Sequence, residues 1–301
     1  MAAPATAAAP DPPARRATTN LHPPASLTQI FKLTRYQLRE YLSSFRFFVL
    51  IGIVVAIGVI LTAIVAYFRH GAEVTSLLSS PLSFYASFWG GATNIVIVLA
   101  AVFFGGDAIA GEFQNKTGYF LMGLPIRRAT VYVGKFIAAL AASIGVLLLF
   151  LVLLLLNGAY YFGGGLFPWE LGVSVVLAIV YLTAVLGATF MFSSLFKTSA
   201  YGFVLTAILF LFGFSLLQDL VQGLIKIEPW MVISYASPVI GNVLSPPTNW
   251  GLSGTIVTTS FGPASITSYT PGIAEGVVIM LVYFFLTSIA GLYLFEREEF
   301  S

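Results

Sequence analysis

The sequence contains no cysteine and only two histidines, His22 and His70. Without cysteine, the protein cannot form disulfides, use a thiol nucleophile or bind a metal through thiolates. The two histidines stand far apart in the chain, so neither a histidine-based catalytic triad nor a histidine-rich metal site is expected. We therefore predict no catalytic residue, no metal site and no cofactor-binding site in this chain.

Charged residues are also scarce. Asp, Glu, Lys and Arg make up 9% of the chain and apolar residues 58%, whereas soluble domains average about 25% and about 45–50%. A helix needs about 20 mostly apolar residues to cross the hydrocarbon core of a bilayer. Stretches that meet or approach this length cover residues 47–68, 84–106, 136–156, 171–192, 200–218 and 273–295. The sequence therefore predicts an all-α, multi-pass membrane protein with six transmembrane helices.

Lysine and arginine fall mainly on one side of these spans. If the N-terminus is cytoplasmic, only Arg69 and Lys226 lie outside. The cytoplasmic cations are then Arg15, Arg16, Lys32, Arg35, Arg39, Arg46, Lys116, Arg127, Arg128, Lys135, Lys197 and Arg297. Because cytoplasmic loops carry the excess of Lys and Arg, we expect a plasma-membrane protein with both termini in the cytoplasm. The cations follow the membrane normal and form no patch interleaved with aromatics, so no nucleic-acid partner is expected.

Two segments precede the first span. Residues 1–25 are rich in Ala and Pro and bury too little to fold, so we expect a disordered tail. In residues 26–46, apolar side chains such as Leu27 recur three or four apart, while cations such as Lys32 line a neighbouring flank. This pattern predicts an amphipathic helix along anionic headgroups, with a cytoplasmic extension of the first span as the alternative. Residues 47–301 then form the six-span membrane domain.

The predicted outer segment between the last two spans is long and rich in proline. Residues 230–244 are apolar but too short to span the membrane, and Pro238 and Gly241 interrupt them. This pattern indicates two short helices that re-enter the outer leaflet; an extracytoplasmic cap without a ligand is the alternative. Residues 247–271 are rich in Ser, Thr and Gly, and we expect an ordered surface loop there.

Ionisable side chains are missing from the middle of the spans, since Asp107, Asp219 and Glu275 lie at span ends. The proton or sodium sites of a secondary transporter, and the polar cluster of an intramembrane enzyme, are therefore not found. The chain also contains no G-x-x-x-x-G-K-[ST] motif to cradle phosphates. If the protein moves a cargo uphill, the energy must come from a partner on the cytoplasmic side.

The inner loop between the second and third spans is the largest candidate surface for such a partner. Its sequence is GEFQNKTGYFLMGLPIRRATVYVGK, from Gly111 to Lys135. The apolar run 119–124 is too short to span the membrane and suits a short surface helix, which Pro125 would end. The alternative is a positively charged loop that only fixes the orientation of the chain.

The pattern of this loop resembles the segment after the second span in permeases of the type-2 ATP-binding-cassette (ABC) exporter family. The residues that carry the resemblance are Glu112, Thr117, Gly118, Leu121, Pro125, Arg127 or Arg128, and Lys135. In outline it extends over residues 27–299, through an amphipathic elbow helix, six spans and a long last outer loop with two re-entrant helices.

The resemblance implies a function and a set of partners. Two copies of the permease, or two related permeases, would pair in the bilayer, each bound through a coupling helix to a separate cytoplasmic ATPase subunit that holds ATP and Mg. By position, Glu112, Thr117 and Gly118 would begin the ATPase contact, Leu121 would pack into it, and Pro125, Arg127 and Arg128 would close it before Lys135 enters the third span. The chain itself would then be no enzyme.

By the same analogy, the pathway would lie between the two permeases and be lined by the first, second and fifth spans. Candidate wall residues are Phe103, Phe104, Phe210 and Phe214, with simple packing of aromatic side chains as the alternative. A different class of function also fits the sequence. The chain could be a membrane anchor or assembly subunit of a larger complex that transports nothing.

Overall fold

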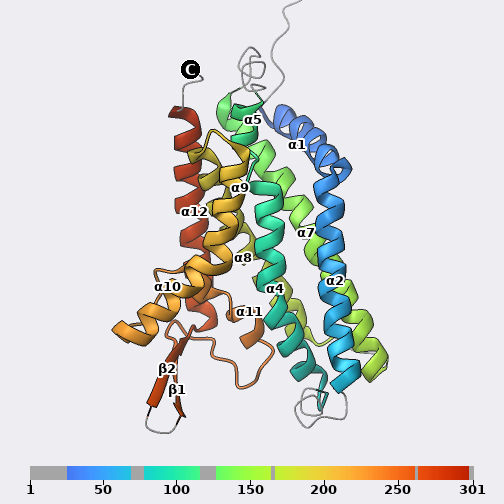
Figure 1. Ribbon diagram of the computed structural model, residues 1–301, viewed down its shortest axis with the longest axis vertical. Helices are drawn as coiled ribbons and strands as arrows, with labels where there is room; N and C mark the ends of the chain where they lie inside the picture. Colours follow the sequence, from blue (N-terminus) through green and yellow to red (C-terminus); the bar gives the residue numbers. More distant parts are fainter. Residues whose placement is uncertain (1–25, 69–77, 116–126, 164–166, 262–263, 298–301) are drawn as a thin grey trace, which may run out of the picture.

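The computed structural model of the protein describes residues 26–68, 78–115, 127–163, 167–261 and 264–297 (Figure 1). In these residues, six helical segments are long and apolar enough to cross a membrane. They are α2 (Phe45–Phe68), α4 (Pro81–Gly105) with α5 (Ala110–Gln114), α7 (Arg128–Phe162), α8 (Trp169–Leu195), α9 (Ser199–Ile208) with α10 (Phe214–Leu220), and α12 (Ile273–Arg297). The six spans expected from the apolar stretches are therefore present as helices.

All six helical segments extend beyond the predicted spans, and the third and fifth show how the ends differ. The third predicted span begins at residue 136, whereas α7 begins at Arg128, because Lys135 is buried inside the bundle and does not end the helix. The fifth predicted span ends at residue 218, whereas the helical segment continues to Ile225 and ends in a π-helical turn, η2 (Val221–Ile225). Another π-helical turn, η1 (Leu209–Gly213), lies within the predicted span. Apolar length alone places the core of a helix better than its ends.

Helix α1 (Ser26–Ser43) precedes the first span and bends away from it (Figure 1). It packs along α7, where Thr34 Oγ1 donates a hydrogen bond of 3.1 Å to the carbonyl of Gly134. Its other faces leave Leu27, Phe31 and Tyr36 exposed. The helix expected in residues 26–46 is thus present, while the predicted tail 1–25 lies outside the described residues.

Helix α8 forms the centre of the bundle and packs against α12, α4 and α7. The largest fully buried side chains include Trp89, Tyr181 and Phe190. Trp89 stacks on Phe150 of α7, with ring centroids 5.9 Å apart. These contacts place the apolar core between four helices that are far apart in sequence.

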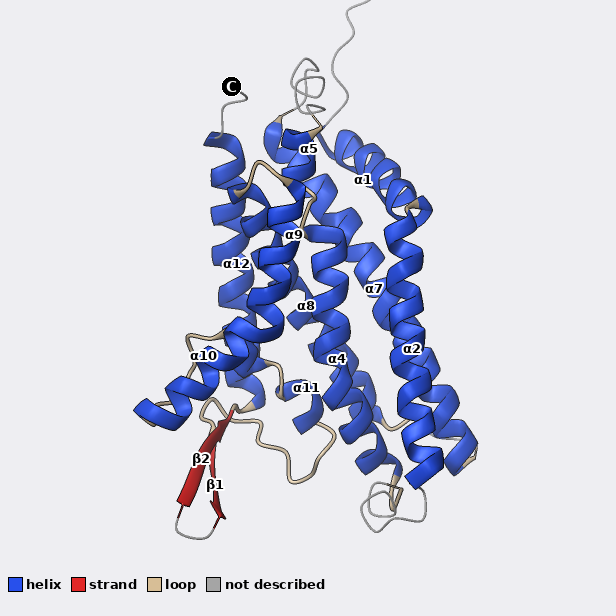
Figure 2. Cartoon of the chain, in the orientation of Figure 1, coloured by secondary structure: helices blue, strands red, loops and turns tan. Residues whose placement is uncertain are grey.

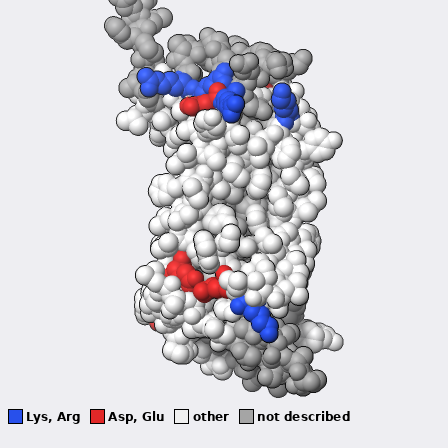
Figure 3. All heavy atoms as spheres, turned by 90° about the vertical axis from the view of Figure 1, so that its left-hand side faces the viewer, with Lys and Arg blue, Asp and Glu red and all other residues white. Residues whose placement is uncertain are grey.

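Charged side chains lie at the two ends of the bundle. On the face shown in Figure 3, a wide belt without Lys, Arg, Asp or Glu separates an upper and a lower charged zone. Apolar side chains of α12, such as Phe285, Leu286 and Ile289, are exposed. Such an uncharged belt with outward-facing apolar groups is what a hydrocarbon solvent requires of a protein surface.

Two short helices, η3 (Ile233–Ala236) and α11 (Val239–Asn242), follow the fifth span. They confirm the two short helices expected in residues 230–244, although their depth in a membrane stays a prediction. Helix α11 lies directly on α4, since the Cα atom of Gly241 is only 2.7 Å from where a Cβ on Gly90 would be. A chain of hydrogen bonds joins the same elements, because Trp89 Nε1 donates to Ser174 Oγ at 2.8 Å and Ser174 Oγ donates to the carbonyl of Ile240.

The prediction of an all-α chain with a surface loop over 247–271 is wrong for part of that segment. Residues Thr255–Phe261 (β1) and Ala264–Thr270 (β2) form an antiparallel hairpin, shown in red in Figure 2, in which Thr255 pairs with Thr270. The strands read TIVTTSF and ASITSYT. Their β-branched residues favour extended backbone, and this signal was hidden by the high content of Ser, Thr and Gly.

Candidate functional site

The candidate site lies where α4 breaks before α5, at the end of the bundle that also carries α1 and the end of α12 (Figure 1). Helix α4 ends at Gly105, and α5 begins at Ala110 after a turn. A break of this kind leaves backbone donors and acceptors without partners inside the helix. Because this turn is mostly buried, those groups need partners from elsewhere in the protein.

Side chains from two other spans supply these partners. Lys135 Nζ of α7 donates a hydrogen bond of 2.8 Å to the carbonyl of Ala108. Ser193 Oγ of α8 accepts hydrogen bonds from the backbone N–H groups of Ile109 and Ala110, both at 3.1 Å. The broken turn is therefore held to both α7 and α8.

Two ion pairs surround the same turn. Lys135 also pairs with Glu112 of α5, and its side chain is 5% exposed. Arg46, at the start of α2, pairs with Asp107, and its side chain is 54% exposed. Removing one partner of a buried pair leaves an uncompensated charge, whereas an exposed pair is weakened by water. The Lys135 pair is therefore the stronger constraint on the position of α5.

The start of the fifth span contacts the same region. The backbone N–H of Ser199 donates to Gln114 Oε1 at 2.8 Å, and Ser199 Oγ donates to Asp107 Oδ2 at 3.3 Å. We call the group formed by Arg46, Asp107, Glu112, Lys135, Ser193 and Ser199, with the turn they surround, the α5 junction. Spans 1, 3, 4 and 5 thus each place a side chain on the last turns of span 2.

A cavity of about 540 Å³ opens beside the α5 junction. Its lining consists of Leu33, Tyr36, Gln37, Glu40 and Tyr41 from α1, Asp107, Ala108, Gly111, Glu112 and Asn115 around α5, and Lys135. A smaller cavity of about 310 Å³ shares Glu40, Tyr41, Asp107 and Asn115 with it. The hydroxyl of Tyr41 is buried without a hydrogen-bond partner in the described residues.

The pKa of Tyr41 is raised above its ordinary value of 10.0, chiefly because the hydroxyl is buried and then because of the negative charges of Asp107, Glu40 and Glu112. The hydroxyl therefore stays protonated near neutral pH and supplies no base. In the part of the chain that the structure describes, no three His, Cys, Asp or Glu side chains gather closely enough to hold a metal ion.

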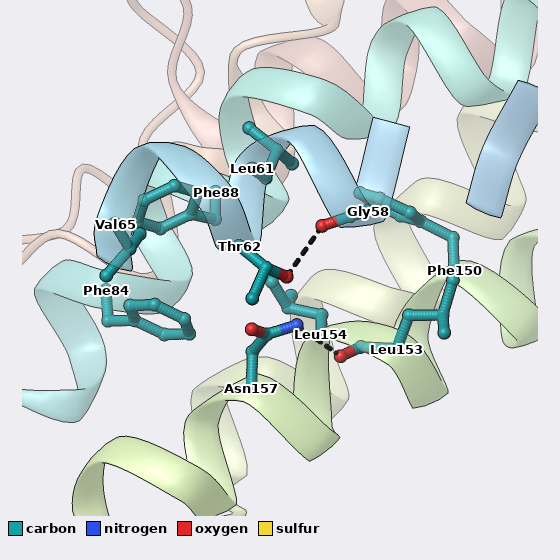
Figure 4. A pocket seen from close by; sticks show the side chains of 10 residues that line it. All are labelled: Gly58, Leu61, Thr62, Val65, Phe84, Phe88, Phe150, Leu153, Leu154 and Asn157. Atoms are coloured by element: carbon teal, nitrogen blue, oxygen red, sulfur yellow. Dashed lines mark hydrogen bonds between the residues drawn. The ribbon is translucent and has the colours of Figure 1, made fainter. Parts of the chain in front are cut away.

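A further cavity lies between α2, α4 and α7, towards the other end of the bundle (Figure 4). Its volume of about 10 Å³ is room for about one water molecule. Its polar side chains form hydrogen bonds within their own helices. Thr62 Oγ1 donates to the carbonyl of Gly58 at 2.7 Å, and Asn157 Nδ2 donates to the carbonyl of Leu153 at 2.9 Å. The cavity cannot accept a cargo.

The structure brings together only some of the predicted coupling residues. Glu112 and Lys135 form an ion pair, Arg127 is exposed at the start of α7, and Arg128 Nη1 donates to the carbonyl of Glu296 on α12 at 2.8 Å. Thr117, Gly118, Leu121 and Pro125 lie outside the described residues. The contact of all eight with an ATPase stays a prediction.

The sequence interpretation missed Ser193 and did not connect Arg46 with Asp107. A single serine in an apolar helix carries no signal of its own, because serine is tolerated there for many reasons. Arg46 and Asp107 gave a usable signal, since opposite charges at two span ends on the same predicted side often pair. The suggested pathway residue Phe104 is buried and lies beside Tyr41 and Phe47.

A family model described as "ABC-2 family transporter protein" matches residues 31–300. The chain belongs to the ABC-2 transporter family. No curated protein matches the sequence. Membership, together with the six apolar helices, makes the chain the multi-pass permease component of an ABC transporter.

Members of the ABC-2 family are membrane transport components and are not themselves catalytic, and they typically pair with an ATPase subunit. The sequence itself contains no phosphate-cradling motif. Two residues of the α5 junction, Glu112 and Lys135, belong to the loop in which the family resemblance is concentrated.

Proposed function

We propose that this ABC-2 permease forms the export pathway of an ABC transporter as a pair of permease subunits, each coupled to a separate cytoplasmic ATPase subunit that binds ATP and Mg. The observation that carries the proposal is the family match over residues 31–300 in a chain with no nucleotide-binding motif of its own. Because ABC-2 members typically pair with an ATPase subunit, that subunit would supply the energy.

The end of the bundle with α1 and α5 would face the cytoplasm of a cell whose plasma membrane holds the protein. Support comes from the cations, because Lys32, Arg35 and Arg46 belong to α1 and the start of α2, while Arg128 starts α7. Cytoplasmic segments next to spans carry such an excess. Helix α1 would lie along the headgroups as the elbow helix, with its exposed apolar side chains in the bilayer.

ATP-driven closure of the two ATPase subunits would move the inner loops, and through them the spans, between inward-facing and outward-facing states. Nucleotide can shift this equilibrium only if it binds one state better than the other. A rigid connection from the loop to several spans favours such a shift, because packed helices move as bodies and do not deform continuously. The re-entrant segment would close the outer end of the pathway.

The test is co-purification of the tagged chain with its ATPase, followed by measurement of ATP hydrolysis in lipid vesicles. Leu121→Asp and Pro125→Ala are expected to reduce coupled hydrolysis about tenfold, which corresponds to ~1.4 kcal/mol of lost coupling. The matched control is Leu252→Asp, since Leu252 is exposed in the segment between the last two spans. That control should keep hydrolysis within about twofold.

Two results would count against the proposal. Hydrolysis in an intact complex that is indifferent to Leu121→Asp and Pro125→Ala would favour the anchor or assembly subunit. A purified chain that transports without a second polypeptide would remove the need for an ATPase. Glycosylation at the acceptor sequence Asn115-Lys116-Thr117 in a glycosylating host would reverse the proposed orientation.

A further inference from the structure

Two of the residues predicted to touch the ATPase are turned into the permease itself. The residue Lys135 is only 4% exposed, and its ammonium group is shared between Glu112 and the carbonyl of Ala108. Two of its three N–H donors are therefore used inside the permease, and a protein that docks from outside would reach almost none of this buried side chain. Its contacts instead join the beginning of α7 to both sides of the break before α5.

The hydrogen bonds at the turn between α4 and α5 are costly to break, because the backbone groups that they pair are buried. The carbonyl of Ala108 and the N–H groups of Ile109 and Ala110 are buried, and each would be costly to leave without a partner. Lys135 supplies the donor from α7, and Ser193 supplies the acceptor from α8. Helix α5 therefore cannot shift relative to α7 and α8 without breaking at least one buried hydrogen bond.

The contacts of the α5 junction differ in strength, because some are exposed to water and others are buried. The pair Arg46 with Asp107 is half-exposed on the arginine side and is screened by water. The contacts of Lys135 and Ser193 are buried and keep their full strength. A displacement of α5 is thus transmitted mainly to spans 3 and 4, and more weakly to span 1 through Arg46 and to span 5 through the exposed contact of Ser199 with Gln114.

We infer that Lys135 and Ser193, with Glu112, are positioning residues that transmit a displacement of α5 to spans 3 and 4, and that they do not themselves contact the ATPase. The inference rests on the proposed function, because it names the residues that carry the coupling within the permease. It assigns Glu112 and Lys135 a different task from the direct contact that the family resemblance implies.

The absence of cysteine allows a direct test. A single cysteine at Tyr160, which is 81% exposed near the far end of α7, is labelled with an environment-sensitive fluorophore in the complete complex with its ATPase. The emission change on adding ATP and Mg is measured together with hydrolysis. In this background, Lys135→Met, Glu112→Gln and Ser193→Ala are compared with Lys197→Met, a matched substitution at an exposed lysine.

Lys135→Met and Ser193→Ala are expected to reduce the nucleotide-dependent emission change about fivefold or more. Assembly with the ATPase should persist, and hydrolysis should stay within about twofold of the parent complex. Lys135→Arg should restore part of the emission change, because it keeps a buried donor and a positive charge. Lys197→Met should leave the signal unchanged.

The inference is overturned if Lys135→Met and Ser193→Ala keep the full emission change, or if they abolish binding of the ATPase, as a direct contact would. Should Lys135→Met fail to fold, Ser193→Ala and Glu112→Gln decide the question alone. If no ATPase co-purifies with the parent chain and ATP with Mg causes no emission change, the proposed function is contradicted, and the inference falls with it. The two failures are therefore distinguishable.

Discussion

Alanine at Gly90 should destabilise the fold, whereas the same change one residue later should not. A Cβ on Gly90 would lie 2.7 Å from the Cα atom of Gly241 on α11, and a Cβ on Gly91 would meet nothing within 4 Å. The obstacle is backbone, which cannot rotate aside as a side chain can. In addition, α11 is held to α8 by the hydrogen bond from Ser174 to the carbonyl of Ile240.

The size of the effect follows from the overlap. Non-bonded carbon atoms are most stable about 3.5–4.0 Å apart, so α11 and α4 would have to separate by roughly 1 Å at Gly90. Overpacking of this kind costs about 1–3 kcal/mol. Alanine also gains ~0.8–1.0 kcal/mol in helix propensity over glycine, but this gain applies equally to Gly91. The difference between the two variants therefore isolates the overlap, about 1–3 kcal/mol.

The assay is the free energy of unfolding in mixed micelles titrated with a denaturing detergent and followed by tryptophan fluorescence. Gly91→Ala should match or exceed the parent protein, and Gly90→Ala should fall below it. Gly241→Ala should be intermediate, since its Cβ would lie 3.1 Å from the Cα atom of Gly90. If Gly90→Ala is as stable as Gly91→Ala, the close contact of α11 with α4 is refuted.

Two further predictions concern single hydroxyl groups. Ser174→Ala removes the acceptor for Trp89 Nε1 and the donor to the carbonyl of Ile240, and the free energy of unfolding should fall by ~1–3 kcal/mol; a loss below about 0.5 kcal/mol, as for an average surface change, would contradict it. The pKa of Tyr41 is raised in the folded state, by burial first and then by charges that include Asp107. A raised pKa gives stability that is complete below the unfolded value and is lost as pH rises towards the folded value. The free energy of unfolding should therefore fall above about pH 10, and the fall should be smaller in Tyr41→Phe; equal slopes in the two proteins would exclude this role of Tyr41.

The sequence predicted the elements of the candidate site better than their geometry. The family resemblance singled out Glu112 and Lys135, and the position of Asp107 at a span end was evident. The sequence could not show that Lys135 lies inside the bundle, because a lysine next to an apolar stretch usually marks the end of a span. Burial of that lysine depends on a carboxylate and a carbonyl that the break before α5 brings to it.

The hairpin β1–β2 shows a different limit. Its β-branched residues favour strands, but two strands without a packed sheet are marginal in water. In the structure, the base of the hairpin is supported by the bundle, since Tyr269 Oη donates to the carbonyl of Lys226 at 2.7 Å and Gln222 Nε2 donates to the carbonyl of Tyr269 at 3.4 Å. The local preference of these residues for extended backbone is therefore not enough to predict the hairpin, because hydrogen bonds from neighbouring segments also support it.

The amino-acid sequence by itself determined that this is a membrane protein and how many spans it has, because both depend on the length of apolar runs and the scarcity of charge. Family membership also rests on the sequence, over residues 31–300. Only the tertiary structure decided which polar groups meet at the α5 junction. A broken helix exposes backbone groups that almost any polar side chain could satisfy, and the packing of α7 and α8 against α4 is what selects Lys135 and Ser193.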